Sequence, residues 1–222
     1  MRSRCKVFRP WRAGSACSND VSTKSDPRRP DSRGLSCRPS RGFTLVEVMV
    51  VVTLVALILT LAAPSFARLA RSAAISSGVN QFLADMRFAR SEAVRRGGGV
   101  ILCRSDEPES PGAACSAGPG NQGWASGWIV FHDLDGNGVR NGDESLLRIQ
   151  APHSGIDTIS TGGTPTTFRF GATGRLLAPG QIASLHFGGT GLDAEIRRVV
   201  CVSAGGRARI AGDGTATCGV EG

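Results

Sequence analysis

The residues with the clearest potential for chemistry lie in one acidic stretch, 133–144. It fits the calcium-loop pattern D-x-[DN]-x-[DN]-G-x5-E, in which oxygen atoms surround the ion. The ligands would be Asp133, Asp135, Asn137, the carbonyl of Val139 and both carboxylate oxygens of Glu144. The flanking segments have the composition of strands rather than helices. A Gly- and Asn-rich hairpin turn with solvated acids is therefore the alternative interpretation.

A second candidate site is the segment Gly206-Arg207-Ala208-Arg209. Alternation along a strand would place Arg207 and Arg209 on one face, and two neighbouring guanidinium groups suit phosphate. Arg197 and Arg198 lie nearby in sequence and would enlarge the patch. DNA is therefore a candidate partner, and a pair of solvated edge-strand arginines is the alternative.

Other residues that often take part in catalysis have no supporting context. The triple glycine 97–99 lacks the Lys-Ser/Thr of a phosphate-binding loop, and no nucleophile accompanies the histidines His132, His153 and His186. Trp124 and Trp128 are most simply interpreted as packing residues. The sequence thus predicts no enzyme, and no cofactor other than the possible calcium.

One carboxylate stands inside an apolar run. Phe43 to Ala63 is 21 residues with Glu47 as its only charge, long enough to span a bilayer. A charge there costs several kcal/mol unless it is paired. A buried core helix is the alternative, but the run is too long and uniform for it.

The charge and the cysteines divide at this run. Residues 1–42 carry 11 Lys and Arg against 3 acids, whereas the remainder carries 15 of each and has no lysine. Basic residues before the run predict that the amino terminus lies in the cytoplasm and that the rest of the chain, after the run, lies outside it. Outside, Cys103, Cys115, Cys201 and Cys218 would form two sequence-local disulfides; a metal site is the alternative.

The remaining elements must position these residues. Apolar residues recur at helical spacing over 65–96 (Leu69, Ala73, Val79, Phe82, Leu83, Met86, Ala89, Ala93), which predicts an amphipathic helix continuous with the apolar run. After Gly99 we expect short strands near 100–103, 128–131, 146–150, 166–170, 184–187, 197–203 and 207–210. The fold class is therefore α+β, with one long helix packed on an antiparallel β-rich head.

The stretch Arg41-Gly42-Phe43-Thr44-Leu45-Val46-Glu47 resembles the type IV prepilin signal. The resemblance implies cleavage between Gly42 and Phe43 by a prepilin peptidase, N-methylation of Phe43, and a neighbouring subunit whose amino group pairs with Glu47. The leader 1–42 is longer than is usual, and a later start at Val21 or Leu35 would explain this. The expected domains are then the removed leader 1–42, the membrane segment 43–64, the amphipathic segment 65–96 and the head 97–222.

Most of residues 41–218 resemble the minor pseudopilins and pilins of the GspH/FimT family. The resemblance rests on VILC, GWASGWIVFHDLDGNGVRNGDESLLR, TFRFGATGRL and VVCVSAGGRARI, in this order after the helix. It implies a type IV pilin-like, single-pass inner-membrane protein with a periplasmic head. Its partners would be lipid, prepilin peptidase and other pseudopilins in a filament.

Two functions follow from this resemblance. One is a structural subunit of the type II secretion pseudopilus, and the other is a FimT-like DNA-binding minor pilin for natural transformation. The G-R-x-R match at Arg207 and Arg209 favours the second. A membrane-anchored adhesin that never polymerises is a third, weaker interpretation.

Overall fold

A computed structural model describes residues 42–162, 166–177, 183–189 and 192–219. The predicted leader, with its three cysteines and the alternative start sites, lies outside these ranges except for Gly42. The chain divides into two compact units, Met1–Leu45 and Val46–Gly222. Of the first unit, only the last four residues are among those described.

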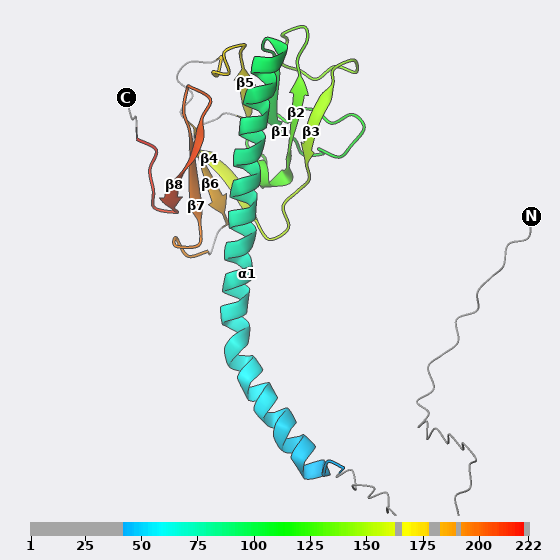
Figure 1. The fold of residues 1–222 in the computed structure, drawn as a ribbon, viewed down its shortest axis with the longest axis vertical. Helices are drawn as coiled ribbons and strands as arrows, with labels where there is room; N and C mark the ends of the chain where they lie inside the picture. The colour runs from blue at the N-terminus through cyan, green and yellow to red at the C-terminus, as the bar shows by residue number, and fades with distance from the viewer. Residues whose placement is uncertain (1–41, 163–165, 178–182, 190–191, 220–222) are drawn as a thin grey trace, which may run out of the picture. The chain divides into compact units, whose positions relative to one another are not determined.

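One uninterrupted helix, α1, spans Leu45–Arg96 and includes Pro64 (Figure 1). Its 52 residues correspond to about 80 Å at 1.5 Å per residue. The helix ends where Gly97 takes a φ of 82° and the amide of Gly98 donates to the Ala93 carbonyl at 2.8 Å. This pattern of bonds is the Schellman ending that glycine favours. The prediction of a continuous helix ended by the triple glycine is confirmed.

The head contains two antiparallel four-stranded sheets (Figure 1). Sheet A has the order β3-β2-β1-β5, and sheet B the order β4-β6-β7-β8. The strands are β1 Val100–Arg104, β2 Trp128–His132, β3 Leu146–Gln150, β4 Thr158–Gly162, β5 Thr167–Phe170, β6 Ala183–Gly188, β7 Arg198–Val202 and β8 Ala208–Asp213. A short 3-10 helix, η1, covers Trp124–Ser126. The α+β fold class is confirmed.

The main core lies where the carboxyl-terminal half of α1 meets the inner faces of both sheets. Phe82 lies at its centre, with edge-on ring contacts to Trp124, Trp128, Phe168 and Phe187 at centroid distances of 5.6–6.2 Å. All five rings are 2% exposed or less. Because these rings come from the helix and from both sheets, α1 is an integral part of the head.

A disulfide attaches a further segment of the chain to each sheet. On sheet A, Cys103 bonds Cys115, and Ile101, Ile129 and Phe131 form a second small core beneath the covering loop. On sheet B, Cys201 bonds Cys218 of the carboxyl-terminal segment. The sequence-local pairing expected for the four cysteines is the pairing in the structure.

A buried arginine supports the covering loop of sheet A. Arg104, only 1% exposed, pairs with Asp106 and donates to the carbonyls of Gly118 (3.1 Å) and Ala117 (3.2 Å). Its hydrogen bond lowers the pKa of the Asp106 carboxyl below its usual value. The loop between β1 and η1 is therefore held by the ion pair and hydrogen bonds of Arg104 as well as by the Cys103–Cys115 disulfide.

Two details differ from the sequence-based expectations. Leu69 is 66% exposed and Ala73 is also exposed, so the buried stripe of α1 begins at Ile75. Strand β4 was not expected, because it reads Thr-Ile-Ser-Thr-Gly and only Ile159 is buried. An edge strand with one inward apolar residue lacks the alternating pattern by which strands are recognised.

Candidate functional site

The amino-terminal half of α1 is the first candidate site. Every side chain from 46 to 71 is exposed, and the apolar 18-residue window within α1 has a mean hydropathy of 2.7 with none of it buried. Among the described residues, α1 is the one helix long and apolar enough to cross a membrane. A soluble protein would have to leave this surface in water, so the segment requires lipid or other helices around it.

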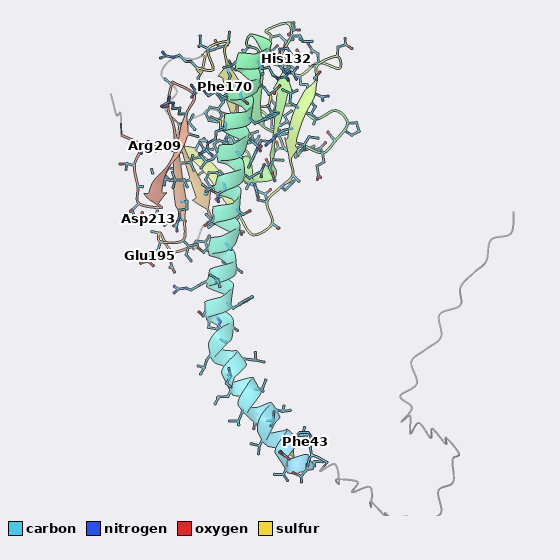
Figure 2. All side chains as sticks on the ribbon, viewed as in Figure 1. Phe43, His132, Phe170, Glu195, Arg209 and Asp213 are labelled. Atoms are coloured by element: carbon cyan, nitrogen blue, oxygen red, sulfur yellow. A yellow bond between two sulfur atoms is a disulfide. The ribbon has the colours of Figure 1, made fainter. Side chains whose placement is uncertain are left out.

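The processing and assembly residues lie at the start of this segment. Phe43 is 81% exposed and, with Gly42, precedes the first turn of α1, which contains Glu47 (Figure 2). Gly42 and Phe43 are both exposed and lie immediately before the helix. Cleavage, methylation and pairing of Glu47 stay predictions.

Where α1 enters the head, a buried acid joins it to sheet A. Asp85 is 1% exposed, and it accepts hydrogen bonds from Trp128 Nε1 (2.9 Å), Arg148 Nη1 (2.6 Å) and Gln81 Nε2 (3.1 Å). The Arg148 guanidinium also lies over the Phe88 ring, 4.1 Å from its centroid. This site was not predicted, although a single acid between Leu83 and Met86 on the apolar face of the helix is a signal that could have indicated it.

The acidic loop between β2 and β3 brings three of its predicted ligands together. Ligand atoms of Asp133, Asp135 and Glu144 all lie within 4.8 Å of one another. Asp133 and Glu144 are each 4% exposed, whereas Asp135, Asn137 and Val139 are exposed at the tip. The cluster therefore has the composition of a calcium site.

The carboxylates of this cluster already have donors. Asp133 accepts from the amides of Gly136 (2.8 Å) and Gly138 (3.0 Å), and Glu144 accepts from those of Leu134 (2.7 Å) and Asn141 (2.9 Å). From β5, Arg169 Nη2 reaches Asp133 at 3.0 Å and the Gly136 carbonyl at 2.8 Å. A guanidinium thus occupies the position beside Asp133 that a cation would take.

The four arginines predicted to bind DNA lie toward different ends of the β7–β8 hairpin. Arg209 lies opposite Cys201, whereas Arg198 lies opposite Asp213, four residues further along β8. Four residues correspond to about 13 Å along a strand. Figure 2 shows Arg209 and Asp213 on the same strand, with Glu195 beyond the Asp213 end.

Arg197 is also separated from the pair. Its aliphatic stem lies between Gly188 and Gly214, where an added Cβ would come within 2.6 and 2.9 Å of it. Its Nε is buried and has no hydrogen-bond partner among the residues that the structure describes. Arg207 immediately precedes β8 in the turn after β7, and both Arg207 and Arg209 are exposed. Of the four arginines, Arg207 and Arg209 lie nearest to each other on the β7–β8 turn and strand, and DNA binding by any of the four stays a prediction.

The tryptophans and His153 belong to the core or its border. Trp124 and Trp128 are buried, as predicted. The His153 ring lies 5.3 Å from the Trp128 ring, and its buried Nε2 has no hydrogen-bond partner within the described ranges. Burial lowers the pKa of His153, and the nearby charge of Asp85 partly opposes this.

Comparisons with known proteins agree with this architecture. Residues 78–206 match the family "Type II transport protein GspH", and residues 37–63 match the "Prokaryotic N-terminal methylation motif". No curated protein sequence matches the chain.

Two similar solved structures are crystal forms of the type IV minor pilin FimU of Pseudomonas aeruginosa, both 17% identical over 64% of this chain. The form in space group P65 has a TM-score of 0.45 and is covered over 98% of its length. The form in P21 has a TM-score of 0.47 and is covered over 93%. The family match extends over more than half of the chain and includes most of the head, so the protein belongs to the type II transport protein GspH family and carries a prokaryotic N-terminal methylation motif.

Proposed function

We propose that this protein is a minor subunit of a pilin-type filament and that it works in the pseudopilus of type II secretion. In this proposal residues 43–64 span the inner membrane, the amino end is cytoplasmic and the head is periplasmic. The methylation motif implies processing by a prepilin peptidase and assembly with other pilins. The proposed role is assembly rather than catalysis.

The observation that carries the proposal is the division of α1 into two environments. One half has no buried side chain, whereas the other half contributes Ile75, Phe82 and Met86 to the core of the head. A helix of this kind is a membrane segment in the monomer. In a filament, its exposed half can pack against the same half of other subunits. Glu47 would then find the amino group of a neighbouring Phe43.

The test is a substitution of Glu47 in the full-length protein in its host. Glu47→Ala should leave cleavage at Gly42–Phe43 intact but abolish cross-linking to other pilins and secretion. Val48→Ala, on the same exposed helix, is the matched control and should behave as the unsubstituted chain. Normal assembly of Glu47→Ala would contradict the role proposed for Glu47, whereas an unsubstituted chain that cross-links to no other pilin would favour the non-polymerising adhesin. A mature protein that starts elsewhere than Phe43 would overturn the proposal.

The second candidate function is DNA uptake by transformation. It is favoured by the exposed Arg207 and Arg209 on the turn and strand after β7. Arg207→Ala with Arg209→Ala separates the two functions. Loss of DNA binding and transformation with intact secretion supports uptake, whereas lost secretion with unchanged DNA binding supports the pseudopilus.

A further inference from the structure

We propose that Arg90 of α1 and Arg175 of the turn after β5 act together with Arg207 and Arg209 as one surface that binds nucleic-acid phosphates. We call these four residues the arginine ridge. The inference deepens the second candidate function and rests on it. The proposed surface includes Arg90 and Arg175, which are distant in sequence, and leaves out Arg197 and Arg198, because Arg198 lies opposite Asp213 at the far end of β8.

Three segments meet to build the ridge. Gly174 lies against α1, because a Cβ added to it would be 3.0 Å from both Cγ and Nε of Arg90. Gly206 lies against the same turn, because its added Cβ would be 2.6 Å from the Gly174 carbonyl oxygen. The amide of Leu176 also donates to the Ala204 carbonyl at 3.2 Å. The turn that carries Arg175 is thus in contact with Arg90 on one side and with the β7–β8 turn on the other.

The two glycines allow this close approach. Gly174 has a φ of 71° and Gly206 a φ of 73°, both in the left-handed region that favours glycine. A side chain at Gly206 would collide with the Gly174 carbonyl, and one at Gly174 would require Arg90 and Val94 to shift slightly. Arg207, which follows Gly206 directly, is therefore held beside the turn that carries Arg175.

The charges on the ridge are of one sign. Arg175, Arg207 and Arg209 are exposed and Arg90 is half-buried. Within the described ranges, Arg90, Arg175 and Arg207 form no ion pair.

The acid nearest in sequence to Arg90 is already engaged. Glu92 binds Arg95 at 2.5 Å and Arg96 at 2.8 Å, and these hydrogen bonds lower its pKa to about 2. It therefore stays charged and bound to these two arginines above that pH. Four arginines gathered from three segments give this surface a concentrated positive charge, which suits a polyanion.

The position of the ridge excludes lipid phosphates as its ligand. Arg90 lies 27 residues beyond Ala63 on the same helix, which is about 40 Å at 1.5 Å per residue. Electrostatic attraction to a charged membrane surface decays within about 10 Å at ordinary salt. The ligand is then a polyanion in the aqueous compartment. Planar arginine forks match phosphate oxygens in pairs, and nucleic acid presents such groups in series.

The experiment measures binding of duplex DNA to the full-length processed chain in neutral detergent, by fluorescence anisotropy across a salt series. Arg90→Gln with Arg175→Gln is the test variant. Arg71→Gln with Arg198→Gln is the control, because it removes the same charge from residues outside the ridge. Each phosphate contact contributes about 0.9 to the slope of the logarithm of the binding constant against the logarithm of the salt concentration. At 0.1 M salt this corresponds to about an eightfold difference in affinity.

The test variant should therefore bind DNA about sixtyfold more weakly, with a slope smaller by about 2. The control should keep the slope. Equal losses in both variants, or an unchanged slope in the test variant, would overturn the ridge. Poly-L-glutamate is a second probe, which stands for an acidic protein. If the test variant loses binding to poly-L-glutamate but keeps binding to DNA, the nucleic-acid proposal is overturned in favour of an acidic protein partner. Thermal unfolding of each variant identifies any loss due to misfolding.

A last comparison separates this inference from the function on which it rests. If Arg207→Ala with Arg209→Ala abolishes DNA binding while Arg90→Gln with Arg175→Gln does not, uptake survives and the extended ridge fails. If the unsubstituted chain binds no DNA, both fail. The filament proposal is untouched in either case, because it is tested at Glu47.

Discussion

The indole Nε1 of Trp128 donates a 2.9 Å hydrogen bond to the carboxylate of Asp85, and both side chains are 1% exposed or less. One group belongs to α1 and the other to the first residue of β2, 43 residues later. The bond therefore fixes the rotation of the helix against sheet A at the depth where the rings around Phe82 pack.

Substitution of Asp85 by Ala should destabilise the head by about 1–3 kcal/mol, because the Trp128 N–H would stay buried without an acceptor. Urea unfolding monitored by tryptophan fluorescence measures the change. Asp85→Asn keeps an acceptor and should lose less, and Glu195→Ala, at an exposed position, should have little effect. A loss for Asp85→Ala no larger than for Glu195→Ala would contradict the structural role.

Calcium binding should depend on Arg169. In the unsubstituted chain the guanidinium beside Asp133 opposes a second cation, so calorimetric titration at millimolar calcium should give no binding heat. Arg169→Ala removes the competing charge and should allow calcium to bind the cluster of Asp133, Asp135 and Glu144. Arg140→Ala, which leaves that pair intact, is the control. Binding by the unsubstituted chain would support the calcium prediction and contradict competition by Arg169.

His153 should make the stability of the head depend on pH. Because burial lowers its folded-state pKa, protons bind the unfolded state more readily. The free energy of unfolding should therefore fall as pH drops below about 6.5, the ordinary histidine value, and level off below the folded-state pKa. His153→Phe keeps a ring beside Trp128 and should remove this part of the pH dependence. An identical pH profile in both chains would refute the assignment.

Each disulfide should stabilise the head by a similar amount. The bonds close segments with sequence separations of 12 and 17 residues, for which the chain-entropy model gives about 3 kcal/mol each. Cys103→Ala with Cys115→Ala, and Cys201→Ala with Cys218→Ala, should both lower the guanidinium midpoint. The reduced unsubstituted chain should be less stable than either variant. Equal stability of oxidised and reduced protein would argue against both bonds.

The sequence predicted the parts of the fold that have a simple period. The apolar run and the stripe from Val79 to Ala93 define α1, and seven of the eight strands follow from short apolar segments between turns. Strand β4 could not be recognised, since a single isoleucine gives no alternation. Its place is set by pairing with β6, a contact between segments distant in sequence.

The candidate sites were predictable only in part for the same reason. Arg207 and Arg209 are close to each other in sequence, and so are the members of the acidic cluster. Arg169 beside Asp133 and Arg90 beside Gly174 depend on sheet order and turn packing. Arg197 is only ten residues from Arg207 in sequence, but it lies just before the start of β7, whereas Arg207 follows the end of that strand.

The packing of α1 against both sheets also sets the order of events during biosynthesis. The apolar face from Ile75 to Ala93 is made more than 100 residues before Val202, the last residue of β7 that covers it. At about 5–20 residues per second, this apolar face stays uncovered for roughly 5–20 s before β7 has been synthesised. During this interval the nascent chain needs a chaperone or a lipid surface to prevent aggregation.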